Sequence, residues 1–203
     1  MRISKLLASS FVALSLLFVS ASASAGPPTD LVRAKQTQLF ELIKQPRTPA
    51  RQVQLKALFD EMLAYDVIGR AALERHWDAL TADQKKRYLD VLTAIVANNY
   101  RRNLQRMQDY DIRYISEEAA TGGGTWVHTE AHHKTDQDEV PIEVSFRIES
   151  VAGRLKVTDL APEGASLQRT YKAQFNRIIK RDGFEGLMSK LEKKRAKQER
   201  NLD

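Results

Sequence analysis

The chain has 203 residues, of which 42% are hydrophobic and 29% charged, and it contains no cysteine. This composition excludes collagen-like, disulfide-stapled and wholly disordered proteins. The formal net charge of +6 comes from 32 basic and 26 acidic side chains, and it raises nucleic acid and anionic membrane surfaces as possible partners.

The first 25 residues have the pattern of a secretory signal. Arg2 and Lys5 precede an apolar run, residues 6–19, that ends in alternating serine and alanine. The run is shorter than the about 20 residues that a membrane-spanning helix needs, so we expect cleavage near Ala25 rather than a retained anchor. Arg2 and Lys5 would leave with the signal, which lowers the net charge from +6 to +4.

Export constrains the partners and the stability of the mature chain, residues 26–203. We expect no nucleic-acid partner outside the cytoplasm. Because no cysteine follows the apolar run, no lipid can be attached through a thiol, and we expect a soluble protein. A single domain of this size buries about 70% of the surface that its unfolded chain exposes, so packing alone can stabilise it.

Helical periodicity dominates the first half of the mature chain. Asp30 is expected to cap a first helix that stops at Pro46, and Thr48 to cap a second helix over residues 49–63. A shorter helical pattern follows over residues 67–77.

The clearest helix start is a capping box, in which Thr81 and Gln84 exchange side-chain bonds with each other's backbone N–H. It opens a long helix to about Gln108. One face of this helix carries apolar and aromatic residues: Tyr88, Leu92, Ile95 and Leu104.

From residue 111 onward the apolar period changes from about 3.6 to 2, which is typical of half-buried antiparallel strands. The strands are expected over residues 112–116, 125–133, 142–148 and 154–160, with turns at 122–124 and 152–153. Helical spacing returns after Gly164, and a last helix begins at Phe184. The order of elements predicts an α+β domain in which helices pack on one face of a curved, four-stranded antiparallel sheet.

The sequence gives little support for catalytic residues. Ser166 follows Gly164 at a probable helix start, where capping is its ordinary role, and no nucleophile-elbow motif is present. Asp159 and Glu163 flank the same strand-to-helix turn, where bonding within the turn explains them better than paired-carboxylate hydrolysis. We therefore expect a protein that is not an enzyme and needs no cofactor.

One strand could bind a metal. His128 and His132 share a face with Glu130 between them, and two imidazoles with a carboxylate suit zinc. Their spacing matches no defined zinc motif, and a solvated edge strand explains the same residues. We therefore expect no metal, and we rank a metal-dependent hydrolase below the two other functions considered at the end of this section.

The chain ends in a basic segment, residues 190–200, that Glu192 and Glu199 interrupt. Positive charge at the C-terminus of a helix complements its dipole, so a solvated helix end explains the segment. A docking surface for acidic protein or lipid headgroups is the alternative.

Residues 153–175 read GRLKVTDLAPEGASLQRTYKAQF. This stretch resembles the signature of the MlaC-type, toluene-tolerance periplasmic phospholipid-binding family: a strand ending in Asp, then a Glu-Gly-Val-Ser-Leu turn and a helix with Tyr and Phe. Trp77, the capping box and the aromatic residues Tyr88 and Tyr100 are also similar to the family pattern. Ala165 and Thr170 stand where the family has Val and Asn.

The resemblance implies a soluble, monomeric periplasmic carrier of phospholipid that maintains outer-membrane lipid asymmetry. Its implied partners are an outer-membrane lipoprotein complex and an inner-membrane ABC transporter with a lipid-binding periplasmic domain. The fold would enclose an apolar cavity for acyl chains. Chosen by face and by match to the family, the expected lipid-binding residues are Phe59, Met62, Trp77, Leu92, Ile95, Val144, Phe146, Leu167, Tyr171 and Phe175.

Two alternatives stay open beside this hypothesis. Because of the departures from the family pattern, the cargo could be another lipid, such as a hopanoid. The chain could also be an exported scaffold or adaptor of the same shape, with a fully packed core and no cargo.

Overall fold

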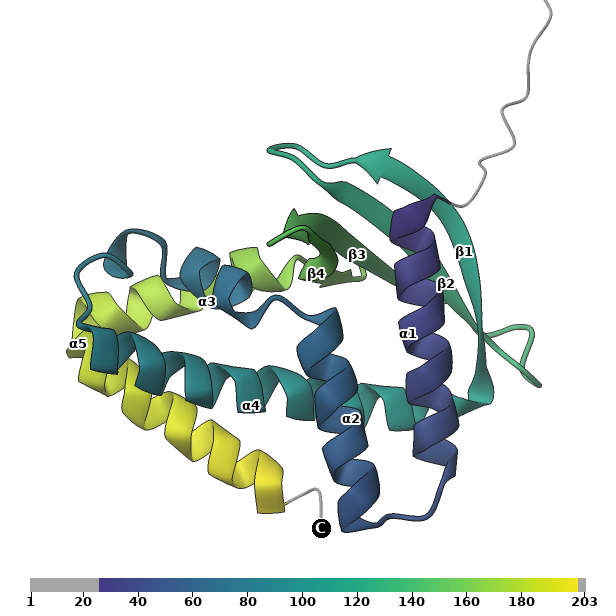
Figure 1. Cartoon of the computed structure of the whole chain (residues 1–203), viewed down its shortest axis with the longest axis horizontal. Helices are drawn as coiled ribbons and strands as arrows, with labels where there is room; N and C mark the ends of the chain where they lie inside the picture. Colours follow the sequence, from purple (N-terminus) through teal and green to yellow (C-terminus); the bar gives the residue numbers. More distant parts are fainter. Residues whose placement is uncertain (1–25, 201–203) are drawn as a thin grey trace, which may run out of the picture.

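The computed structural model describes residues 26–200, so the expected signal segment lies outside the described residues. Five α-helices and four strands occupy this range, joined in places by single 3₁₀ turns (Figure 1). The helices are α1 (Pro27–Lys44), α2 (Pro49–Met62), α3 (Tyr65–Leu73), α4 (Ala82–Arg106) and α5 (Leu167–Arg200). The strands are β1 (Tyr110–Ala119), β2 (Thr125–His133), β3 (Ile142–Val151) and β4 (Arg154–Pro162).

The strands form one antiparallel sheet in the order β1-β2-β3-β4. Its hairpins turn through residues of positive φ, at Gly122 to Gly124 and at Ala152 and Gly153, as the sequence predicts. Register shifts in β1 and between Arg147 and Ile148 of β3 mark bulges, which bend a sheet. The expected curved, four-stranded meander is therefore confirmed.

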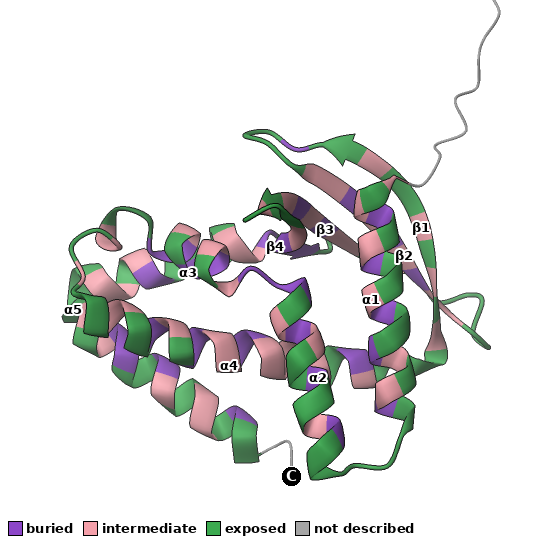
Figure 2. Ribbon diagram, viewed as in Figure 1, coloured by how far each residue is buried: buried purple, intermediate pink, exposed green. Residues whose placement is uncertain are grey.

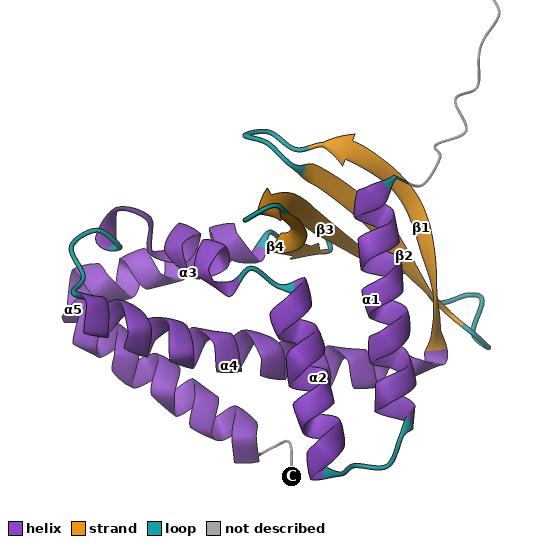
Figure 3. Ribbon diagram, in the orientation of Figure 1, coloured by secondary structure: helices purple, strands orange, loops and turns teal. Residues whose placement is uncertain are grey.

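The helices lie on one side of the sheet (Figure 3). Helix α1 contacts β1 and β2, while α2, α3 and α5 contact β4. In β2, Val127, Thr129 and Ala131 are buried on the helical side, and the side chains between them face outward. The interpretation of this strand as an edge strand was wrong, because β2 pairs with both β1 and β3.

Helix α1 begins at Pro27, three residues before the predicted cap at Asp30. Two prolines open the helix, where no N–H is needed. The carboxylate of Glu117 in β1 accepts hydrogen bonds from the backbone N–H groups of Gly26 at 3.1 Å and Thr29 at 2.8 Å. The cap thus comes from a distant strand, and pattern reading along the helix could not find it.

Helix α5 consists of two segments that meet at Gly183, where φ is 69° and ψ is −177°. The prediction of two helices with a break before Phe184 is confirmed. The second segment folds back along α4 (Figure 1, yellow). Arg87 of α4 fixes it there through ion pairs to Glu185 at 2.7 Å and Glu192 at 2.8 Å.

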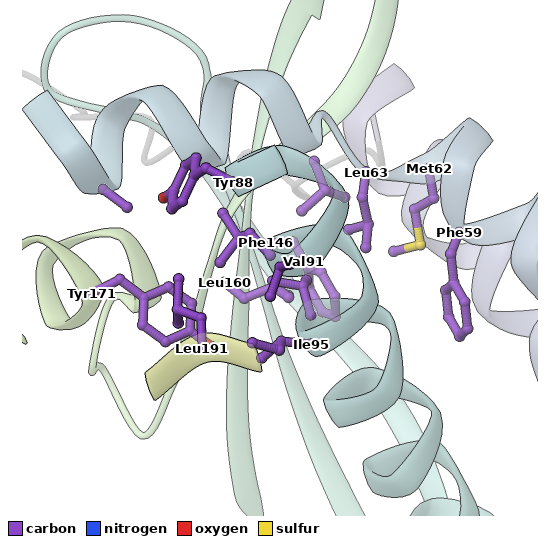
Figure 4. Packing of buried hydrophobic residues seen from close by; sticks show 14 of the residues in the cluster. Phe59, Met62, Leu63, Tyr88, Val91, Ile95, Phe146, Leu160, Tyr171 and Leu191 are labelled. Atoms are coloured by element: carbon purple, nitrogen blue, oxygen red, sulfur yellow. The ribbon is translucent and has the colours of Figure 1, made fainter. Parts of the chain in front are cut away.

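The core lies where helices α2 to α5 meet β3 and β4 (Figures 2 and 4). Its largest fully buried side chains include Phe59, Tyr88 and Phe146. The Tyr88 hydroxyl donates to the carbonyl of Gly69 at 3.1 Å, so this buried polar group is satisfied. None of the helices between residues 26 and 200 has the length and apolar character to cross a membrane.

Candidate functional site

An apolar pocket of about 470 Å³ opens between the inner face of the sheet, helix α1 and the C-terminal end of α4. The sheet contributes Tyr110, Ile112, Thr129, Ala131, Ile142, Val144, Phe146, Leu160 and Pro162. The helices and the turn after α4 contribute Gln36, Phe40, Tyr100, Asn103, Leu104, Arg106, Met107 and Leu167.

The spacing of these residues follows from the elements that carry them. Alternate residues of a strand point to one face, so Ile142, Val144 and Phe146 of β3 all reach the pocket. Residues three or four apart share one side of a helix. Gln36 and Phe40 of α1 have this spacing. The pocket is thus a place where two amphipathic layers meet without closing on each other.

Two polar side chains in the pocket wall, Gln36 and Thr129, have hydrogen-bond partners within the protein. Gln36 is 6% exposed, and its side-chain oxygen accepts from the Tyr114 hydroxyl at 2.7 Å. The Thr129 hydroxyl donates to the carbonyl of Val144 at 2.7 Å. Burial raises the pKa of Tyr100 above its usual range, which keeps this hydroxyl neutral. A ligand entering here would therefore meet mainly carbon.

Three of the ten predicted lipid-binding residues line this pocket: Val144, Phe146 and Leu167. Tyr171 lies in an adjoining groove, which Leu167 also lines. Phe59 does not line the pocket, but its ring meets that of Tyr100, which does, edge-to-face at 5.2 Å between centroids.

The other predicted residues pack in the helical core away from the pocket. Trp77 lies edge-to-face with Tyr88 at 6.4 Å, and Phe175 stacks on Tyr171 at 5.3 Å between ring centroids. The three remaining residues are at most 1% exposed within the same cluster: Met62, Leu92 and Ile95.

Sequence reasoning missed the contribution of α1 and β2. Phe40 follows Leu39 in a helix with apolar residues on more than one side, so helical spacing alone does not assign it to the pocket. Thr129 and Ala131 have small side chains, and Thr129 is polar, so neither has a strong apolar signal in the sequence. The signal that could have found them is the alternation along 125–133, which places both on the face of Val127.

His128 and His132 lie on the outer face of the sheet, away from the pocket. His133 has the opposite orientation, and its ring lies 5.0 Å from that of Tyr110, which lines the pocket. His128 Nδ1 lies 2.8 Å from Ser145 Oγ, and His132 Nε2 lies 2.8 Å from Glu130 Oε2. The two rings thus have separate partners. Over the described part of the chain, no three side chains of His, Asp or Glu are grouped so that they could hold a metal ion.

Ser166 has the capping role that the sequence predicts. Its Oγ accepts from the backbone N–H of Arg169 at 3.1 Å and donates to the buried carboxylate of Asp159. Gly164 has a φ of 71°, the positive angle expected in this turn. These residues shape the passage from β4 into α5.

Two comparisons place the chain among known proteins. Residues 33–193 match the family model described as MlaC protein. The fold resembles the solved structure of a phospholipid-binding protein from Ralstonia solanacearum in complex with a phospholipid, with a TM-score of 0.66 and 21% sequence identity. The match covers 83% of this chain and 94% of that chain. No protein with a curated description matches.

Proposed function

The chain belongs to the MlaC protein family, and from that premise we propose that it is a periplasmic carrier that holds phospholipid with its acyl chains in the apolar pocket. The observation that carries the proposal is the pocket itself. Its volume of about 470 Å³ lies within the range of about 300–1,000 Å³ that is usual for ligand sites. The likeness to a fold that binds a phospholipid in another protein supports the same ligand.

The energy of acyl chains explains why such a protein needs a pocket and no catalytic group. Each buried CH₂ is worth about 0.8 kcal/mol, so two acyl chains with about thirty methylenes represent on the order of 20 kcal/mol relative to water. A lipid does not leave a bilayer for water at that cost. A carrier that offers similar apolar surface makes the exchange nearly neutral, because the chains remain buried at every step.

Direction would then come from the partners. A ligand shifts an equilibrium only by its differential affinity for the two states. We propose that an outer-membrane lipoprotein complex and an inner-membrane ABC transporter differ in how they bind the loaded and empty carrier. This traffic would maintain lipid asymmetry, and the expected signal, residues 1–25, would deliver the protein to the periplasm. A related lipid such as a hopanoid remains the alternative cargo.

Native mass spectrometry of protein purified without detergent, followed by lipid extraction, tests the proposal. We expect co-purified phospholipid, and uptake of phospholipid by delipidated protein from vesicles. Absence of both would contradict the carrier function. Recovery of a hopanoid instead would keep the carrier and change the cargo.

A matched pair of substitutions locates the lipid. Val144→Trp adds an indole to the pocket wall, and Val140→Trp makes the same change at a site that is 81% exposed. We expect Val144→Trp to lower lipid occupancy several-fold, because the ring fills space that acyl chains would use. Val140→Trp should leave occupancy unchanged. Equal occupancy in the two variants, with unchanged circular dichroism spectra, would place the lipid elsewhere.

A further inference from the structure

A second groove, of about 550 Å³, lies between α4 and the two segments of α5. Its floor is apolar and includes Val96, Leu160 and Tyr171. Its rim carries three cationic side chains, Arg102 from α4 and Lys194 and Lys197 from the returning segment of α5. No residue that lines this groove is acidic.

The three cations lack the ion pairs that neighbouring basic residues make. Arg181 and Lys190 both bind Asp182, and Arg195 lies 3.7 Å from Glu199. Between residues 26 and 200, no ion pair involves the cations of the groove rim. The positive charge of the groove is therefore uncompensated.

Lys194 is exposed and lies over an aromatic ring at the edge of the groove. Its ammonium lies 5.6 Å from the centroid of the Tyr171 ring. Partial burial lowers the pKa of Lys194, and the charge of Arg102 lowers it further. Arg102 is itself oriented by Asn99, whose side-chain oxygen lies 3.2 Å from its Nη2. An anion between these two cations would offset their mutual repulsion.

The basic groove adjoins the apolar pocket. The two share five lining residues: Tyr100, Asn103, Leu160, Pro162 and Leu167. One ligand with an apolar part and an anionic part could therefore occupy both sites at once. The fold offers mainly carbon on one side of these residues, where Arg106 is the one basic side chain among the described residues of the pocket wall, and three cations on the other.

The groove on the opposite side of the pocket does not offer the same charge. It contains Arg33, Lys44 and Lys134, but also Glu41 and Asp111. Lys44 is paired with Glu41 at 2.7 Å. Three basic side chains there face two acidic ones, so most of the positive charge is offset. The basic groove, with three cations and no acidic residue among its described lining residues, is therefore the more favourable side for an anionic group attached to a ligand in the pocket.

We propose that Arg102, Lys194 and Lys197 bind the phosphate of a diacyl phospholipid whose acyl chains occupy the apolar pocket. The assignment rests on the proposed function, and it adds a site that binds the phosphate of the headgroup. Hydrogen bonds between ionised partners are about twice as strong as neutral ones. The groove would thus distinguish lipids with a phosphate from lipids of the same chain length without one.

A competition between two lipids in the same vesicle tests whether the groove binds phosphate. Because both lipids lie in one membrane, the result does not depend on how the protein docks there. The delipidated full-length protein is equilibrated with vesicles of palmitoyl-oleoyl-phosphatidylglycerol that contain a minor fraction of palmitoyl-oleoyl-glycerol. Bound lipids are extracted, and their ratio is compared with that of the vesicles. We expect the wild type to enrich the phospholipid at least about tenfold. Both lipids leave the same surface, so the ratio reports the bound state.

The triple variant Arg102→Gln, Lys194→Gln, Lys197→Gln should bind both lipids with little preference. Lys193→Gln, which removes one exposed charge of the same helix outside the groove, should retain the wild-type preference. An unchanged preference in a folded triple variant would overturn the inference. Uptake of neither lipid by the wild type would instead contradict the proposed carrier function.

Inorganic phosphate distinguishes a headgroup site from a site for the free anion. We expect excess phosphate to reduce the preference for phosphatidylglycerol, since both anions would compete for the same cations. Phosphate that binds at the three cations while the lipid preference stays unchanged would mean that the groove serves the free anion. That result would also overturn the inference.

Discussion

Asp159 joins the end of β4 to the start of α5 and is only 4% exposed. Its Oδ1 accepts from the backbone N–H groups of Leu160 at 2.8 Å and Gln168 at 3.0 Å, and its Oδ2 accepts from the Ser166 hydroxyl. One carboxylate thus satisfies three donors in a turn that also contains Gly164. The acidic residue of this sequence signature acts here as a structural acceptor.

Replacing this acceptor should destabilise the protein. Asp159→Ala leaves a hydroxyl and two N–H groups without their partner, and we expect a loss of about 3 kcal/mol in the free energy of unfolding. Urea denaturation measures the loss. Asp138→Ala, in an exposed loop, is the control and should change stability by less than about 0.5 kcal/mol. Normal stability with reduced lipid occupancy in Asp159→Ala would instead indicate a headgroup ligand.

At the scale of elements, the reversal of α5 depends on Gly183. Its φ of 69° and ψ of −177° lie in a region that only glycine adopts readily. Asp182 adds one ion pair across the break, to Lys190 at 2.8 Å, and a second to its neighbour Arg181 at 2.9 Å. These pairs are exposed, so the glycine is the stronger determinant of the reversal.

Gly183→Ala should lower the free energy of unfolding by about 1–3 kcal/mol, because alanine is strained in this backbone conformation. The cost is not a clash, since no neighbouring atom lies within 4 Å of the added Cβ. Thermal or urea unfolding gives the value. Gly153→Asn is a useful comparison, since asparagine tolerates the positive φ of that hairpin turn and should change stability little. A Gly183→Ala variant as stable as the wild type would show that the break relaxes freely.

The sequence predicted most elements because their signals are local. The capping box of Thr81 and Gln84 is present, with hydrogen bonds of 3.0 and 3.2 Å, and Thr48 caps α2. Long-range effects escaped prediction. The start of α1 depends on Glu117, and the interior position of β2 depends on pairing with two other strands.

The pocket was harder to predict than the fold. Period-2 alternation identifies which residues of β3 face the helices, so Val144 and Phe146 were found. On α4 the same pattern selects residues that face inward, but it does not distinguish a packed interior from a cavity wall. Leu92 and Ile95 therefore lie in the core, while Leu104, further along the same helix, lines the pocket.

At the scale of the whole molecule, buried tyrosines link stability to pH. Burial raises the pKa of Tyr65, Tyr88 and Tyr100 above the usual range, and it raises the pKa of Tyr114 to about 12. In the unfolded chain a tyrosine titrates near about pH 10. The folded form therefore retains protons that the unfolded form loses, and stability present below about pH 10 declines as the pH rises further.

Alkaline titration should show cooperative unfolding in which tyrosinate absorbance and loss of helical circular dichroism coincide. Lys194, whose pKa is lowered, acts in the opposite direction but is a single group. Tyr110→Phe provides the comparison. The hydrogen bond to Glu139 raises the pKa of Tyr110, but this pair is exposed to solvent, so removing the hydroxyl should shift the transition less than removing a buried one. Gradual tyrosine ionisation without unfolding would contradict the expected linkage.

The capping of α1 by β1 also has a consequence for the order of folding. Gly26 and Thr29 donate to a carboxylate that lies 91 and 88 residues further along the chain. The N-terminal end of this helix is synthesised first, yet it gains its acceptor only when β1 has formed. Contacts between residues so far apart in sequence form slowly. The wall of the pocket that α1 provides is therefore completed only after β1 has been made and has paired.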